Sequence, residues 1–470
     1  MSASTNKRTA DMTTGPFLKK IILFAIPLIC TGLLQQLYNA ADLIVVGMFD
    51  GQIALAAVGA TGSLTNLVIG LFMGLSVGAG VSVAHHIGEK KEDEVQKVAH
   101  TSILLSGILG VVIALVGYIF APTLLLWMGT PDTVITYATL YVRIIFMGFP
   151  AHLIYNYAAS MLRSAGDAKR PLIFLSISGI VNVLLNLLLV AVFHMGVAGV
   201  ALATITSQYL SACMVVLYMR HTAGPLHISL RRLRLYREKV KKILYIGIPS
   251  GIQGTLFSLS NVLVQSSVNS FGDVVMAGNA ASQNLESLVY IAMNAMYHVS
   301  LTFIGQNVGA KTYHNIKKIV RYGVVVVSAI GLSIGALMFF FRTPLISLYA
   351  PNNPEVMAAA FSRMQIIMFT YFLCGIMEVY CGAMRAMGKS ITAMIISLCG
   401  ACGFRILWIL TVFQLFRTQT GLYLVYPCSW ILTSAVYAVF FTIALRRLTS
   451  QNPMAKWQIG DEKKDLTAVS

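Results

Sequence analysis

Long apolar runs separated by short polar segments make up most of this chain. Each run is long enough to cross a bilayer as an α-helix, which needs about 20 predominantly apolar residues. The pattern predicts twelve helices and no strand, and therefore an all-α integral membrane protein. The predicted helices cover residues 17–48, 54–83, 95–120, 133–159, 171–193, 196–219, 240–270, 275–308, 316–341, 356–384, 390–415 and 421–446.

Composition supports a membrane protein and excludes a soluble one. The chain has 470 residues, of which 57% are hydrophobic and only 11% are charged. A water-soluble domain of this length could not carry such a composition on its surface. The first apolar run, which begins near Phe17, is too long for the hydrophobic part of a cleavable signal. We expect it to be the first spanning helix.

The net charge of +17 reports the topology of the chain. On the predicted helix map, nearly all of the 34 lysines and arginines lie on one side of the membrane. This positive-inside distribution predicts that both termini and the basic linker at 220–239 are cytoplasmic. Because topology accounts for the positive charge, we do not expect the protein to bind nucleic acid. The five exceptions are Arg143, Arg342, Arg363, Arg405 and Arg417.

The two halves of the chain resemble each other at a constant offset of 222 residues, which aligns Lys20, Pro27 and Asn39 with Lys242, Pro249 and Asn261. A duplicated six-helix unit enters the membrane twice from the same side, so the repeats are parallel. Two such lobes are typical of transporters. The predicted parts are a cytoplasmic tail (1–16), an N-lobe (17–219), a cytoplasmic linker (220–239), a C-lobe (240–446) and a second cytoplasmic tail (447–470).

Of the 17 acidic residues, only Asp42, Glu286 and Glu378 fall well inside predicted spans. An intramembrane carboxylate costs about 2.5 to 3.5 kcal/mol on insertion scales, and such groups are usually functional. Asp42 has no charged neighbour in its own helix to neutralise it. The alternative to a functional role for this carboxylate is a structural ion pair.

Several short motifs, taken in order along the repeat, resemble the multidrug and toxic compound extrusion (MATE) transporters. They are Asp-x4-Gly at 42–47, NVLLN at 182–186, GVAGVALAT at 196–204, and Arg-x2-Gly at 163–166 and 385–388. The resemblance covers about residues 15–450 and is closest to bacterial members that place the key acid in the N-lobe, the DinF/MepA-like type. It implies two parallel six-helix lobes and an ion-driven transport activity.

The resemblance also implies an ion-coupling set. Asp42 matches the first-helix aspartate that the family uses to bind a proton or sodium ion. Asn182 and Asn186, four residues apart, share one helix face, and Thr204 completes a set similar to the family's N-lobe cation site. Ordinary interhelical hydrogen bonding is the alternative. Many relatives carry aspartate where this chain has Asn186, so the site here would hold one carboxylate where theirs holds two. Its oxygens suit Na+, but a single carboxylate could equally bind and release one H+, so both ions remain open as the coupling ion.

Other polar residues are secondary candidates. Pro27 interrupts the first helix and resembles a proline that family models assign to a bending motion, although a static kink fits equally well. Arg405 needs an anion inside the membrane, and Glu378 or Glu286 is predicted to pair with it, with contact to the substrate as the alternative. His85 and His86, at a helix end, are expected to be solvated or to face lipid headgroups. Cys399 and Cys402 lack a second pair, so no metal site is predicted beyond a possible Na+.

We therefore predict a secondary active antiporter of a bacterial cytoplasmic membrane that exports amphipathic, often cationic organic compounds by alternating access. It would not be an enzyme, would use no cofactor besides Na+ or H+, and would act as a monomer whose partners are the bilayer and a small organic substrate. A lipid-linked precursor flippase of the same superfamily is the nearest alternative, and usually has a cationic cavity. An intramembrane enzyme is the second, but no catalytic motif supports it.

Overall fold

The computed structural model describes residues 11–49, 51–349 and 353–450, and these residues form helices joined by short turns. The outer parts of both predicted tails, 1–10 and 451–470, lie outside this range. The long helices are α1 (Phe17–Phe49), α2 (Gly51–Gly88), α3 (Glu92–Trp127), α4 (Asp132–Met147), α5 (Phe149–Ser164), α6 (Lys169–Asn186), α7 (Gly196–His221), α8 (Arg237–Asn269), α9 (Asp273–Gly309), α10 (Tyr313–Phe340), α12 (Pro354–Ala386) and α17 (Val425–Ser450).

Short helices complete the order along the chain. They are η1 (Leu187–Val192), η2 (Leu230–Arg232), α11 (Arg342–Ser347), α13 (Ser390–Ser397), η3 (Leu398–Gly403), α14 (Phe404–Leu410), α15 (Val412–Leu415) and α16 (Gln419–Tyr423). Within the described residues, ten helical segments are long and apolar enough to cross a membrane, and the bent pair α4–α5 makes eleven. Helix α8 also forms where a span is predicted, but its first residues, 237–242, are mostly charged. The predicted all-helical membrane fold is confirmed.

The predicted helix at 133–159 is divided into α4 and α5, which meet at an angle of 46°. Gly148 separates the two helices, and Pro150 lies in the first turn of α5. Proline has no backbone N–H and its ring collides with the preceding turn, so it ends one helix and suits the start of the next. The bend is therefore encoded locally.

The described residues form two compact units whose limits lie inside helices. Unit 1 contains residues 30–251, and unit 2 contains residues 11–29 and 252–450. The chain passes from one unit to the other within α1, two residues after Pro27, and within α8, two residues after Pro249. Each unit thus consists mainly of one repeat plus the first half-helix of the other.

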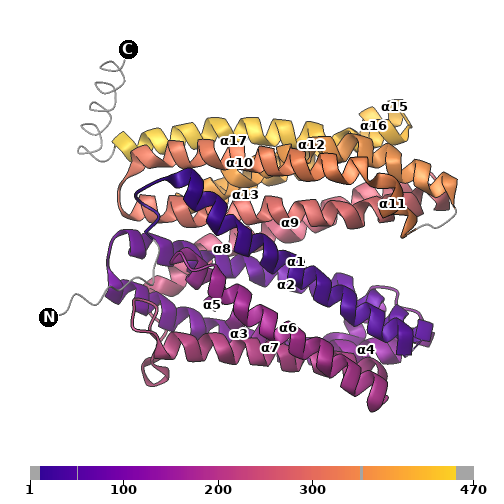
Figure 1. Cartoon of the computed structure of the whole chain (residues 1–470), viewed down its shortest axis with the longest axis horizontal. Helices are drawn as coiled ribbons and strands as arrows, with labels where there is room; N and C mark the ends of the chain where they lie inside the picture. Colours follow the sequence, from indigo (N-terminus) through magenta and orange to yellow (C-terminus); the bar gives the residue numbers. More distant parts are fainter. Residues whose placement is uncertain (1–10, 50, 350–352, 451–470) are drawn as a thin grey trace. The chain divides into compact units, whose positions relative to one another are not determined.

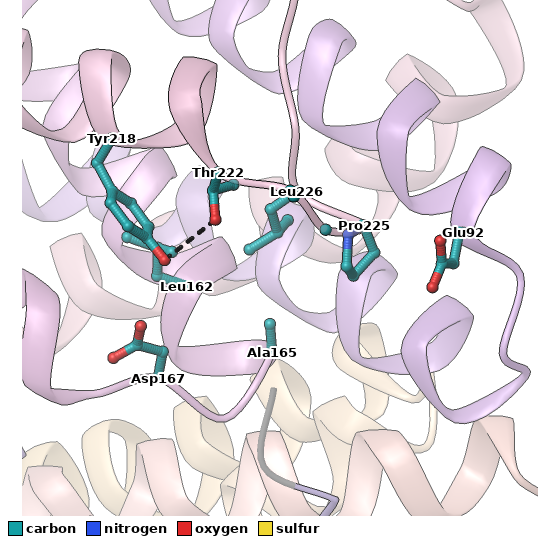
Figure 2. Close-up of a pocket in the computed structure, with 10 residues that line it drawn as sticks. Glu92, Leu162, Ala165, Asp167, Tyr218, Thr222, Pro225 and Leu226 are labelled. Carbon is teal, nitrogen blue, oxygen red and sulfur yellow. Dashed lines mark hydrogen bonds between the residues drawn. The ribbon is translucent and has the colours of Figure 1, made fainter. Parts of the chain in front are cut away.

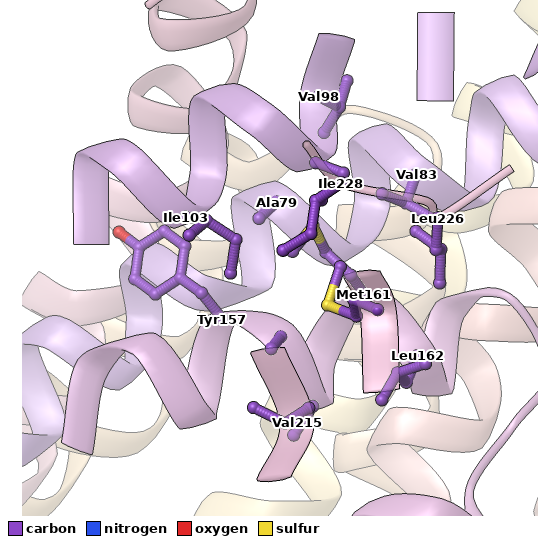
Figure 3. Close-up of a cluster of buried hydrophobic side chains, with 14 of the residues drawn as sticks. Ala79, Val83, Val98, Ile103, Tyr157, Met161, Leu162, Val215, Leu226 and Ile228 are labelled. Carbon is purple, nitrogen blue, oxygen red and sulfur yellow. The ribbon is translucent and has the colours of Figure 1, made fainter. Parts of the chain in front are cut away.

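The core of unit 1 lies where α2, α3, α5 and α7 run alongside one another (Figure 1). Met161 of α5 is fully buried at its centre, between Ala79 of α2, Val98 of α3 and Val215 of α7 (Figure 3). Ile228, from the segment after α7, inserts into the same cluster. Because these side chains exclude solvent from one contiguous cluster, the segment between the repeats is anchored to unit 1.

Small residues bring α2 close to the first half of α8, inside unit 1. Gly74 and Gly78 on α2 face Gly247 and Gly251 on α8, each pair separated by three residues. A Cβ atom on Gly78 would lie only 2.1 Å from the carbonyl oxygen of Ile243. Crossed small-xxx-small motifs of this kind let helix backbones touch in an apolar environment. They fix the first half of α8 to unit 1.

The N-terminal segment before α1 is held in unit 2 by side-chain amides of α9 and α10. The backbone N–H of Met12 donates to Gln306 Oε1 at 3.1 Å, and Asn307 Nδ2 donates to the carbonyl oxygen of Met12 at 2.9 Å. Asn315 Nδ2 donates to the carbonyl oxygen of Thr13 at 2.9 Å. These bonds satisfy backbone groups ahead of α1 and tie its first half to the bundle of α9, α10, α12 and α17.

Candidate functional site

Asp42 lies in the second half of α1, within unit 1, and only 8% of it is exposed. One turn further along α1, Val45 and Val46 belong to a small apolar cluster that also receives side chains from α2, η1 and α7. The carboxylate is therefore next to packed aliphatic side chains. In this setting its charge must be stabilised by groups contributed by other helices.

Neutral side chains from α6 and α7 supply those groups. Asn186 Nδ2 donates to Asp42 Oδ1 at 2.5 Å, and Thr204 Oγ1 donates to Asp42 Oδ2 at 3.1 Å. Asn182, one turn before Asn186, accepts from Asn186 Nδ2 through Oδ1 at 3.3 Å. The structure thus brings together the four residues of the predicted ion-coupling set, around one carboxylate and without an ion pair among the described residues.

The site contains oxygen atoms that could accept further hydrogen bonds. Asn186 Oδ1 is buried and has no hydrogen-bond donor among the described residues. Thr204 has one hydroxyl hydrogen but two acceptors in reach, Asp42 Oδ2 and the carbonyl oxygen of Val200 at 2.9 Å. If the hydroxyl donates to Val200, its lone pairs face the carboxylate. Such oxygens can coordinate a hard cation, or accept the proton of a neutral carboxyl group.

The backbone changes its winding at this site. Asn186 is the last residue of α6, and the helix continues from Leu187 to Val192 as the π-helix η1. A π-helical turn is wider than an α-helical one, and such turns are often found at functional sites. Because the number of residues per turn changes at Asn186, the side chains before and after it project from the helix in different directions than in a continuous α-helix. Val190 of η1 packs in the same small apolar cluster as Val45 and Val46.

Pro27 lies in α1 fifteen residues before Asp42, but in the half of the helix that belongs to unit 2. The predicted conformational residue and the predicted ion-coupling residue are therefore on opposite sides of the point where α1 passes between units. Pro249 occupies the matching place in α8.

Glu286 forms an ion pair with Arg363, not with Arg405. Arg363 Nε donates to Glu286 Oε1 at 2.6 Å and Nη2 donates to Oε2 at 2.7 Å, which is a bidentate arrangement. Ser282 and Asn279 complete the hydrogen bonding of the pair. Only 2% of Arg363 is exposed. The sequence placed both charges inside predicted spans, but it did not indicate which arginine pairs with Glu286.

The predicted pairing of Arg405 with Glu378 or Glu286 is wrong. Arg405 Nη1 donates to Asn261 Oδ1 at 2.9 Å, and Nε makes a long contact of 3.4 Å with Ser429 Oγ. No carboxylate lies within ion-pair distance of Arg405 among the described residues. Glu286 is already bound by another arginine, which sequence spacing could not reveal because the contact depends on how α9, α12 and α14 are rotated.

Glu378 is partly buried on α12, and the cation that acts on its charge is Arg385, seven residues later on the same helix. Arg385, predicted only as part of a turn motif, is itself buried. Its guanidinium donates to the hydroxyl of Tyr297, and Nη2 donates to Gln253 Oε1 at 2.7 Å. Arg385 therefore links α12 to α9 and α8 inside unit 2.

His86 is buried in a polar network rather than solvated, so that prediction is wrong. Its Nε2 lies 3.0 Å from Lys239 Nζ, which can only donate, and its Nδ1 lies 3.1 Å from Glu89 Oε2. A neutral ring that accepts from lysine and donates to glutamate satisfies both contacts. Burial tends to raise the pKa of Glu89, but hydrogen bonds from Lys91 and His86 outweigh it and hold that pKa below its usual value.

A cavity of about 190 Å³ lies elsewhere in unit 1, near the end of α7. Glu92 from α3, Asp167 from the α5–α6 turn and Pro225 from the segment after α7 border it, and Tyr218 is hydrogen-bonded to Thr222 on its wall (Figure 2). The cavity is smaller than the 300 to 1,000 Å³ typical of drug-sized ligand sites. We assign no function to it.

Comparison with known sequences places the chain in one family. The sequence model of the MatE family matches residues 27–188 and again residues 249–410. Both limits of the second match follow those of the first by 222 residues, so the predicted internal repeat is confirmed. The two matches together cover more than half of the 470 residues.

Individual relatives are similar over most of their length. The chain is 29% identical over 395 residues to the probable multidrug resistance protein YoeA of Bacillus subtilis, covering 83% of this chain and 85% of that protein. It is 21% identical over 388 residues to the multidrug export protein MepA of Staphylococcus aureus, covering 82% of this chain and 85% of that one.

A solved structure has the same fold. It is described as an outward-facing conformation of a multidrug resistance MATE family transporter of the MOP superfamily, and it superposes with a TM-score of 0.86 at 22% identity, covering 95% of this chain and 100% of that one. The twofold match of the family model, the long relatives and the shared fold agree. The chain therefore belongs to the MatE family of multi-pass membrane transporters.

Proposed function

We propose that this protein is a secondary active antiporter that exports amphipathic, often cationic organic compounds in exchange for Na+ or H+ by alternating access. Its relatives named for multidrug resistance and multidrug export support this choice of substrates. The bacterial origin of those relatives and the distribution of basic residues favour a bacterial cytoplasmic membrane, with both termini inside.

The observation that carries the proposal is the buried carboxylate of Asp42, whose hydrogen-bond partners among the described residues are neutral groups from two other helices. A structural role would favour an ion pair, as at Glu286. A coupling role requires that the charge be formed and neutralised in each cycle. Asn182, Asn186 and Thr204 would then act as oxygen ligands of Na+, or as hydrogen-bond partners of the protonated acid.

The alternating-access cycle would couple this site to the passages of the chain between units. Ion binding at Asp42 and substrate binding would favour different conformations of the same protein. Pro27 and Pro249 stand beside the two passages, and we propose that Pro27 allows α1 to change its bend.

A lipid-linked precursor flippase receives less support. Of the arginines that could make a cationic interior, Arg363 is neutralised by Glu286. Arg143 lies 5.1 Å from the ring of Tyr118 and donates to its carbonyl oxygen. Arg143 is only partly buried, and of the two fully buried arginines in this set only Arg405 lacks a carboxylate partner among the described residues, which is less positive charge than a pyrophosphate-linked substrate would require.

The test is Asp42→Asn, which keeps the volume of the side chain but removes its titration. We expect folded yield by detergent gel filtration to be unchanged or higher, because an intramembrane charge is removed. Efflux of a fluorescent organic cation from proteoliposomes should fall to background. Imposing sodium and proton gradients separately on the wild-type protein identifies the coupling ion.

A structural role for Asp42 predicts the opposite result, with loss of folded protein and normal turnover by the fraction that remains. An Asp42→Asn protein that pumps at the wild-type rate under either gradient would remove this residue from the mechanism.

A further inference from the structure

Two buried arginines of unit 2 lie against the ring of Tyr426, but only one of them has a carboxylate partner among the described residues. Arg363 is bound by both oxygens of Glu286, so its charge is neutralised. Arg405 is 3% exposed, and the described residues offer it no carboxylate. Glu378, the other acid in a predicted span, interacts with Arg385. A buried guanidinium without a counter-charge is costly, and cannot escape the cost by losing its proton.

The hydrogen bonds of Arg405 leave donors unused. A guanidinium has five N–H donors. Nη1 reaches Asn261 Oδ1 at 2.9 Å, Nε lies at a weak 3.4 Å from Ser429 Oγ, and the structure gives Nη2 no acceptor among the described residues. The fork that would bind a planar oxyanion through two parallel hydrogen bonds is therefore largely available.

Aromatic rings hold the guanidinium in place without neutralising it. Tyr426 contacts both arginines, with the Arg405 guanidinium carbon 4.6 Å and that of Arg363 5.0 Å from its ring centre. Phe257 of α8 lies 5.9 Å from Arg405. Cation–π contacts orient a guanidinium and offset part of its desolvation, but the net charge remains. The rings also provide an apolar wall for an organic ligand.

Asn261 connects this buried guanidinium to an exposed position of unit 2 through a hydrogen bond. The residue is exposed, whereas Arg405 behind it is not. Its amide oxygen is neutral and occupies one of the two Nη groups. A ligand carboxylate that displaced this amide would exchange a neutral acceptor for a charged one, which makes a shorter and stronger hydrogen bond.

We propose that Arg405 and Asn261 form a binding site for the anionic group, a carboxylate or sulfonate, of an amphipathic organic substrate. The inference rests on the proposed transport function and narrows its substrates: compounds that carry an organic cation together with an acidic group are preferred over their neutralised esters. The phosphate of an anionic lipid has related chemistry and is separated from a substrate acid by the choice of bilayer.

The probes are rhodamine B and its ethyl ester, which share one cationic ring system and differ in a free carboxylate at pH 7. Binding is measured by fluorescence anisotropy with the full-length protein in phosphatidylcholine nanodiscs. We expect the wild-type protein to bind the acid about ten-fold or more tightly than the ester, and Arg405→Gln to remove that difference while binding of the ester is retained.

Two further variants keep the test informative if Arg405→Gln folds poorly. Asn261→Asp places a permanent carboxylate at the donor of Arg405, so it should abolish the preference for the acid and raise the unfolding temperature. Arg143→Gln, which also removes an arginine from the face of a tyrosine but in unit 1, should leave the preference unchanged.

Several outcomes would overturn the proposal. These are equal binding of the two dyes, binding of neither, or a preference that persists in Arg405→Gln or Asn261→Asp. Loss of the preference in nanodiscs that contain phosphatidylglycerol would assign the site to a lipid phosphate instead. Failure of the transport function is seen separately, as absence of ion-driven efflux of the ester by the wild-type protein.

Discussion

Single residues in this protein show two ways of keeping a carboxylate inside an apolar helix bundle. Glu286 is matched by a permanent cation, whereas the described part of the chain offers Asp42 amide and hydroxyl donors and no cation. The first arrangement fixes the charge, because removing either partner strands the other. The second permits the carboxylate to be protonated and deprotonated, because its partners are neutral whether or not Asp42 is charged.

Arg363→Met should therefore be strongly destabilising. It leaves Glu286 buried without a cation, and breaking a buried pair in this way typically costs about 3 to 5 kcal/mol. We expect a lower unfolding temperature in detergent and a smaller monodisperse peak on gel filtration. Adding Glu286→Gln removes the stranded charge and should restore part of the loss. Losses that simply add in the double variant would show that the pair is not the source of the effect.

Several helices in this protein approach one another closely at glycines. On α2, Gly74 and Gly78 contact the backbone of α8, while Gly70, one turn before Gly74, has open space around the position of a Cβ atom. One helix thus contains glycines with and without a packing role. The difference is invisible in the sequence, where all three are spaced by four residues.

Gly78→Ala should destabilise unit 1, and Gly70→Ala should not. A methyl group at residue 78 would lie 2.1 Å from a carbonyl oxygen of α8, so the helices must separate, at about 1 to 3 kcal/mol. At residue 70 the same methyl group meets nothing within 4 Å, and the higher helix propensity of alanine adds up to about 1 kcal/mol. Thermal unfolding of the two purified variants compares them directly. Equal unfolding temperatures would contradict the close packing of α2 on α8.

At the scale of the whole molecule, the first half of α1 belongs to unit 2 and the first half of α8 belongs to unit 1. The described chain passes between units only inside α1 and α8, just after Pro27 and Pro249. Proline removes one backbone hydrogen bond of a helix and permits a kink there. In each of these two helices, the turn in which proline removes a backbone hydrogen bond therefore lies next to the point where the chain passes between the units.

Pro27→Ala and Pro249→Ala should each slow transport without harming the fold. Alanine restores the missing N–H and stiffens the helix beside the passage between units. We expect an unfolding temperature equal to or above that of the wild-type protein and an efflux rate reduced several-fold in proteoliposomes, with substrate binding retained. Wild-type rates in both variants would mean that the prolines are static kinks.

Much of the fold and part of the site could be predicted from the sequence. Apolar runs predicted the helices, and the offset of 222 residues predicted the repeat that the family model matches twice. The spacing of Asn182 and Asn186 placed both on one face, and the family resemblance brought Thr204 to the same carboxylate. These predictions depend on local periodicity and on a preserved order of motifs, and both are properties of a linear chain.

Other features were decided only by tertiary structure. The partner of Glu286 is Arg363 and not Arg405, His86 is buried against Lys239, and the first halves of α1 and α8 pack in the unit opposite to the rest of their repeat. Each depends on the rotation and axial position of helices that are far apart in sequence. Apolar periodicity shows which face of a helix avoids water, but inside a membrane every face can be apolar, so the sequence by itself leaves helix contacts undetermined.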